Sequence, residues 1–120
     1  MKIVKIVLTS LVAVLFLFSA SGKLIPGMMP AEQTSKMVND LGGASNVMIL
    51  GCIELLIVLL WFIPRTSLLG GFVAVAYMGG ATAAHVVTHQ PIIPLLIVQS
   101  VIWTTIAIRF PETTAKLRGN

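Results

Sequence analysis

Charge is the scarcest property of this sequence. Its 120 residues include only eight Lys or Arg and four Asp or Glu, so 10% are charged, against about 25% in average soluble proteins. So few charges cannot cover the surface of a soluble domain, and the mean hydropathy of +0.99 agrees with this. Most of the chain forms apolar runs close to the ~20 residues that cross a bilayer. The sequence therefore indicates an integral membrane protein, with the lipid bilayer as its first partner.

Cysteine is almost absent as well. The single Cys52 excludes an intramolecular disulfide and a C-x-x-C redox pair, and the chain has neither a flavin motif nor a haem ligand set. It therefore has no self-contained catalytic or redox motif, and in an oxidoreductase it would be at most a non-catalytic subunit. The net charge of +4 does not indicate nucleic acid, because Lys and Arg stand singly at the ends of apolar runs.

Four apolar runs account for nearly the whole chain. Pro26 and Pro64 end the first two runs, and Pro91 precedes the fourth. Unbroken apolar runs lack the apolar/polar alternation of a membrane barrel, so they predict helices. We expect one all-α domain over residues 1–120, an integral membrane four-helix transmembrane bundle with spans at about 3–25, 47–63, 68–88 and 92–108 and an outer loop at 27–46.

The distribution of Lys and Arg predicts the orientation of this bundle. Lys23 and Lys36 lie on one side, and six cations lie on the other, namely Lys2, Lys5, Arg65, Arg109, Lys116 and Arg118. Because positive residues concentrate in the cytoplasm, we expect both termini to be cytoplasmic. An alternative is that the first run is a signal peptide cleaved after Ser19-Ala20-Ser21, which would leave three spans.

The outer loop contains a helical pattern. Thr34, Met37, Val38 and Leu41 follow the i, i+3, i+4, i+7 spacing, which predicts a short interfacial helix covering the outer mouth of the bundle. An irregular loop is the alternative for so short a segment.

Glu54 is the one charge inside a span. It lies about seven residues into the second run, or roughly 10 Å deep, where an unpaired carboxylate is costly. It must therefore face protein or water. Lys23, near the outer end of the first run, is its expected partner; the alternative is that the Lys23 side chain extends to the membrane interface. Glu54 has two possible roles. It either fixes the packing of the helices, or it has a function, in which it lines a ligand pocket or carries protons.

The third and fourth runs add polar groups at a similar depth. Thr82 and His85 share one face of the third run with His89, and Gln99 lies about seven residues into the fourth. We therefore expect an outward-facing polar pocket of Lys23, Glu54, Thr82, His85 and Gln99. No metal site is expected, since only Glu54 could join the two histidines. The small residues Ala76, Gly80 and Ala84 are expected to pack closely against another helix.

Four segments contain most of the distinctive residues of the apolar runs and their ends: FSASGKL at 18–24, LGCIELL at 50–56, IPRT at 63–66 and YMGGATAAH at 77–85. These segments resemble those of the DoxX-like membrane proteins. The resemblance covers about residues 8–108 and places Lys23, Glu54, Arg65 and His85 at matching polar positions. It implies a bacterial inner-membrane protein with four spans, some of whose relatives are subunits of quinone-linked oxidoreductases or partners of redox and stress-defence enzymes.

Three functions are compatible with these features. The first is an accessory subunit of a quinone-linked or stress-related redox complex. In this role the polar pocket of the subunit accepts a quinone or similar small molecule, and quinone is the one cofactor that the sequence suggests. The second is a proton-coupled small-molecule transporter, although four-span exporters carry their glutamate in the first helix. The third is a structural membrane scaffold, and any of the three could form a homo-oligomer.

Overall fold

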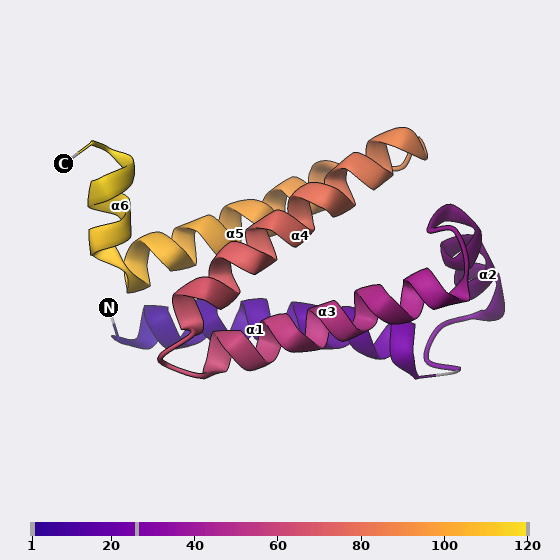
Figure 1. Ribbon diagram of the computed structural model, residues 1–120, viewed down its shortest axis with the longest axis horizontal. Coiled ribbons are helices and arrows are strands. Elements are labelled where there is room, and N and C mark those ends of the chain that lie inside the picture. Colours follow the sequence, from indigo (N-terminus) through magenta and orange to yellow (C-terminus); the bar gives the residue numbers. More distant parts are fainter. Residues whose placement is uncertain (1, 26, 120) are drawn as a thin grey trace.

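The computed structural model describes residues 2–25 and 27–119, and within these ranges the chain forms helices and no strands (Figure 1). The helices are α1 Lys2–Leu24, α2 Ala31–Asp40, α3 Ala44–Phe62, α4 Ser67–Val87, α5 Ile93–Arg109 and α6 Pro111–Leu117. The expected all-α architecture is confirmed, and α1, α3, α4 and α5 coincide closely with the four apolar runs.

Length and composition make these helices suitable for a bilayer. α1, α3 and α4 are each long and apolar enough to cross one, and α5 with α6 gives a fourth span if this pair, bent by 109°, counts as one. α5 alone has 17 residues and is therefore about 26 Å long. Pro111 at the start of α6 lacks an amide hydrogen, which favours a helix start there.

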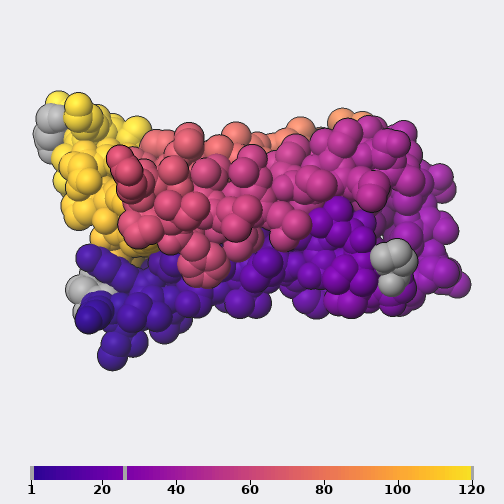
Figure 2. Space-filling view, turned by 60° about the horizontal axis from the view of Figure 1, so that its bottom comes forward, coloured from indigo at the N-terminus to yellow at the C-terminus, as the bar shows by residue number. Residues whose placement is uncertain are grey.

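The four long helices form a closed ring. α1 packs against α3 and α5, and α4 packs against α3 and α5. Figure 2 shows α1 and α3 lying side by side along one face, with α6 projecting at the end where the chain begins. Buried apolar side chains from all four helices, including Phe16, Ile57, Ala74 and Ile106, make one core.

The bundle is tightest near α6, at what we call the α6 end. A Cβ added at Gly70 would lie 2.7 Å from the backbone nitrogen of Trp61, and one at Gly71 would lie 3.0 Å from Ile106. Trp61 itself is buried and donates its indole N–H to the carbonyl of Thr9 over 3.0 Å. α4 therefore packs closely against α3 and α5 here, and the Trp61 hydrogen bond joins α3 to α1.

At the opposite end, the α2 end, α4 and α5 diverge from α1 and α3 (Figure 1). α2 lies at this end and packs against α3. Glycines with positive φ flank it: Gly27 at 83°, Gly42 at 88° and Gly43 at 130°, which other residues adopt only with strain. The helix expected in the outer loop is therefore present.

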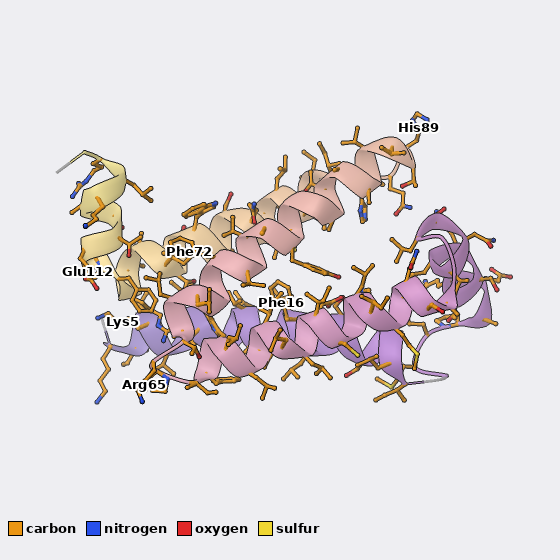
Figure 3. All side chains as sticks on the ribbon, viewed as in Figure 1. Lys5, Phe16, Arg65, Phe72, His89 and Glu112 are labelled. Atoms are coloured by element: carbon orange, nitrogen blue, oxygen red, sulfur yellow. The ribbon has the colours of Figure 1, made fainter. Side chains whose placement is uncertain are left out.

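Charge separates along the long axis of the bundle. Lys5 and Arg65 lie at the α6 end together with Glu112, whereas His89 lies at the tip of α4 (Figure 3). This matches the separation of cations that predicts the orientation, and it leaves the α2 end with two cations, Lys23 and Lys36.

Candidate functional site

The centre of the site is the carboxylate of Glu54 in α3, which is completely buried at 0% exposure. Lys23 Nζ lies 2.6 Å from Glu54 Oε1, and the hydroxyl of Tyr77 donates to the same oxygen over 2.6 Å. The other oxygen, Oε2, has no hydrogen-bond partner among residues 2–25 and 27–119. The ion pair expected between Lys23 and Glu54 is confirmed, and Tyr77 completes a triad from α1, α3 and α4.

Gly51 lets α1 reach this carboxylate. It lies one turn before Glu54 on the same face of α3, and a Cβ there would lie 2.8 Å from Leu24 Cγ and 3.1 Å from Lys23 Cβ. The last turn of α1 therefore packs against a position without a side chain. Lys23 also donates to the hydroxyl of Ser19 over 2.7 Å, so its ammonium is held from both sides.

Tyr77 is a site residue that was not predicted from the sequence. Its ring packs edge-on against Phe16 of α1, with centroids 6.0 Å apart. Its position near the middle of an apolar helix could have indicated a role in the site, because a buried tyrosine hydroxyl requires a hydrogen-bond partner. Glu54 is the acceptor that meets this requirement.

A cavity of about 590 Å³ opens beside the triad. α1, α2, α3 and α4 all contribute to its lining, and α5 does not. The lining residues are Lys23, Met29, Gln33, Lys36, Met37, Asp40, Leu41, Leu50, Ala76, Tyr77, Gly80, Ala81, Ala84, His85, Thr88 and Gln90. From Ala76 to Thr88 the lining follows α4 for about 18 Å.

The small residues of α4 have a different role from the expected one. Ala76, Gly80 and Ala84 line the cavity, and a Cβ added at Gly79 or Gly80 would meet nothing within 4 Å. The expectation that this stripe packs closely against another helix is therefore wrong. Small-residue spacing permits close approach, but the divergence of α4 from α1 and α3 leaves an open space on this face instead.

The predicted polar residues are only partly brought together. Lys23 and His85 line the cavity, and Glu54 lies behind its wall, bonded to Lys23 and Tyr77. Thr82 donates to the carbonyl of Met78 within its own helix. The amide of Gln99 donates to the carbonyl of Val75 over 3.3 Å, so this side chain links α5 to α4. Neither Thr82 nor Gln99 is among the lining residues.

His85 has a defined tautomer in this arrangement. Its Nδ1 lies 2.8 Å from the carbonyl oxygen of Ala81, and because a carbonyl only accepts, Nδ1 must donate. In the neutral ring Nε2 is then a hydrogen-bond acceptor.

The second histidine, His89, follows α4 with a φ of 58°. In the described part of the chain no three His, Cys, Asp or Glu side chains gather as a metal-ligand set.

Comparison with known families agrees with this architecture. The model of the DoxX-like family matches residues 7–108, which is most of the chain. The protein belongs to the DoxX-like family. No curated protein and no solved structure gives a significant match. In this DoxX-like protein Lys23 and His85 line the cavity and Glu54 is bonded to Lys23, whereas Arg65 is exposed in the α3–α4 turn at the α6 end.

Proposed function

We propose that this DoxX-like protein binds a membrane-soluble small molecule, best matched by a quinone head group, and acts as an accessory subunit of a quinone-linked or stress-related redox complex. The observation that supports this most is a largely apolar cavity with hydrogen-bonding groups from Lys23 and Tyr77 in its wall. Such cavities, mostly apolar with a few convergent polar groups, are typical ligand sites.

The donors and acceptors in the wall suit both redox forms of a quinone. An ammonium has three N–H donors, and Lys23 uses two of them on Glu54 and Ser19. The third is available to a carbonyl oxygen of the oxidised form. Nε2 of neutral His85 can accept from a hydroxyl of the reduced form. The protein would hold the ligand, and the partner enzyme would supply the redox chemistry.

Binding is tested with purified protein in lipid nanodiscs that contain quinone. The wild type should retain about one quinone per chain after repeated washing, measured by extraction and chromatography. Ala84→Leu, which extends a side chain from the cavity lining, should lose it. Ala83→Leu is the matched control, because Ala83 is exposed and not among the lining residues. A wild-type protein that retains no quinone would refute the proposal.

The role as an accessory subunit needs a separate measurement. Gentle extraction of the tagged protein from its native membranes, after cross-linking, should recover a redox enzyme. Its quinone-dependent activity should fall when Ala84→Leu replaces the wild type and persist with Ala83→Leu. Recovery of the protein alone, with the quinone bound, would restrict the function to ligand binding.

Proton-coupled transport is a second candidate, favoured by the spare oxygen of Glu54. A fully buried carboxylate with one unpartnered oxygen in the described chain is a candidate proton site within the membrane. Reconstituted protein would then show substrate-dependent proton flux in liposomes, abolished by Glu54→Gln. Flux that persists in Glu54→Gln, or no flux with any cavity ligand, counts against transport.

The location proposed for this protein is the bacterial cytoplasmic membrane, with the α6 end in the cytoplasm. The concentration of Lys and Arg at that end supports this orientation. A protease added to sealed right-side-out vesicles should leave a tag at either terminus intact. Cleavage of either tag would reverse the assignment for that terminus, and an isolated protein lacking its first 21 or so residues would indicate a signal peptide.

A further inference from the structure

The wall that α4 contributes to the cavity contains a row of small residues beside the larger side chains of Tyr77 and His85. Ala76, Gly80 and Ala84 recur at every fourth position on one face, so side chains of one carbon or none extend over about 12 Å of helix. At Gly80 the space beyond the backbone is open, with no atom within 4 Å of an added Cβ.

The other walls carry long, adaptable side chains. Met29 precedes α2, Met37 lies on α2, and Leu50 comes from α3. Methionine side chains fit irregular shapes, and their sulfur atoms make favourable contacts with aromatic rings. The small residues of α4, together with these flexible apolar side chains, suit a ring. One face of the ring can lie against the small residues, and the ring can also contact the polarizable methionine sulfur atoms.

The polar part of the wall limits the charge of the ligand. Lys23 is already neutralised by Glu54 at 2.6 Å, so an anionic head would meet a pair without net charge and would compete with Glu54 for the same ammonium. A neutral carbonyl oxygen needs only the one N–H that Lys23 has left. At Lys23 the site thus favours an uncharged hydrogen-bond acceptor on the ring. Lys36 and Asp40, one cation and one anion, line the α2 side of the cavity and add no net charge to it.

We infer that the cavity selects a planar, uncharged ring with a carbonyl oxygen, which lies against Gly80 with that oxygen directed to Lys23. This inference rests on the proposed function and adds to it a ligand shape and a specificity-determining position. Gly80 provides the contact surface for the ring. A side chain at this position would occupy the space of the ring without disturbing the protein, because nothing lies beside it.

The neighbouring glycine provides a matched control. Gly79 lies on the same helix and has equally open surroundings, but it is not among the lining residues. Gly80→Leu and Gly79→Leu therefore add the same side chain to the same helix, one inside the cavity and one outside it. Gly80→Ala is the milder variant, and helical circular dichroism with a thermal melt checks that each protein is folded.

The probes are a benzoquinone with a decyl tail and a saturated cyclic diketone with the same tail, titrated calorimetrically into nanodiscs. The wild type should bind the planar quinone at least about tenfold more tightly than the puckered diketone. Gly80→Leu should weaken quinone binding by about tenfold or more, and Gly79→Leu should change it by less than about twofold. Gly80→Ala should give an intermediate loss.

The outcomes separate this inference from the proposed function. If the wild type binds both probes equally, or if Gly80→Leu and Gly79→Leu bind the quinone equally well, the planar-ring inference is wrong while ligand binding stands. If the wild type binds neither probe, the proposed quinone function fails and the inference fails with it.

Discussion

Removing the charge of Lys23 tests the ion pair that organises the α2 end. In Lys23→Met the long apolar stem is kept and the ammonium is lost, so Glu54 becomes a buried carboxylate held only by Tyr77. Breaking a buried ion pair by removing one partner costs about 3–5 kcal/mol. The Lys23 side chain is 13% exposed while that of Glu54 is 1% exposed, so little solvent screening is available. We expect a cost near 3 kcal/mol, the lower end of that range.

Removing both charges should restore part of this stability. In Lys23→Met/Glu54→Met no unpaired charge is left, so the double variant should be more stable than Lys23→Met alone. The hydroxyl of Tyr77 then loses its acceptor, which costs about 1–3 kcal/mol for a buried donor. Adding Tyr77→Phe removes that donor and should recover most of the loss. This order of stabilities distinguishes a coupled triad from three independent polar residues.

The assay is reversible unfolding in mixed micelles, followed by far-ultraviolet circular dichroism, with the free energies combined as a double-mutant cycle. A coupling energy of about 2 kcal/mol or more between Lys23 and Glu54 is expected. The reasoning is refuted if Lys23→Met costs less than about 0.5 kcal/mol and the effects of the two substitutions simply add. In that case the ammonium lies at the membrane surface and Glu54 is satisfied by other groups.

Three further predictions concern the packing of the bundle and the cover formed by α2. Gly70→Ala should destabilise the protein by about 1–3 kcal/mol, because the new Cβ would lie 2.7 Å from the backbone of Trp61; thermal melts would show this, and an unchanged melting temperature would contradict the tight α6 end. Gly79→Ala should leave stability unchanged or raise it by up to about 1 kcal/mol, since the site is open, and a clear loss in the same melts would be inconsistent with this. Gln90→Ala should speed hydrogen exchange in α2, because Gln90 donates to Asp40 over 2.7 Å and thereby ties α2 to the α4–α5 turn; equal exchange rates in the two proteins would argue against that tie.

Much of the architecture could be predicted from hydropathy and proline positions alone. Bilayer thickness sets the length of the helices, and Pro64 and Pro91 mark where chain reversals begin. The intramembrane cost of charge also identified Glu54 and its partner Lys23. These inferences succeeded because each depends on a local or one-dimensional property, namely run length, helix termination or depth.

The rest of the site depends on how helices are tilted and rotated, which a single sequence does not contain. Thr82 was expected in the pocket, but a threonine in a helix can satisfy itself on the carbonyl four residues earlier, as it does with Met78. Gln99 was also expected in the pocket, but its amide bonds to the backbone of Val75. Tyr77 was not selected because a tyrosine in an apolar helix can also serve as an aromatic packing residue, and only the helix arrangement shows that its hydroxyl reaches Glu54.

The glycines show why spacing by itself does not determine packing. Gly70 and Gly71 lie where α4 leaves a short turn after α3, so the backbones are forced together there and a Cβ would collide with Trp61. Gly79 and Gly80 lie two to three turns farther along the same helix, where its separation from α3 has grown and the same residue type leaves open space. The contacts of Trp61 at the α6 end fix the point from which α4 diverges. The Lys23–Glu54–Tyr77 triad limits how far α4 can move away from α1 and α3. The cavity is therefore a consequence of that tilt, and filling it at Gly80 should affect ligand binding without loosening the anchored end.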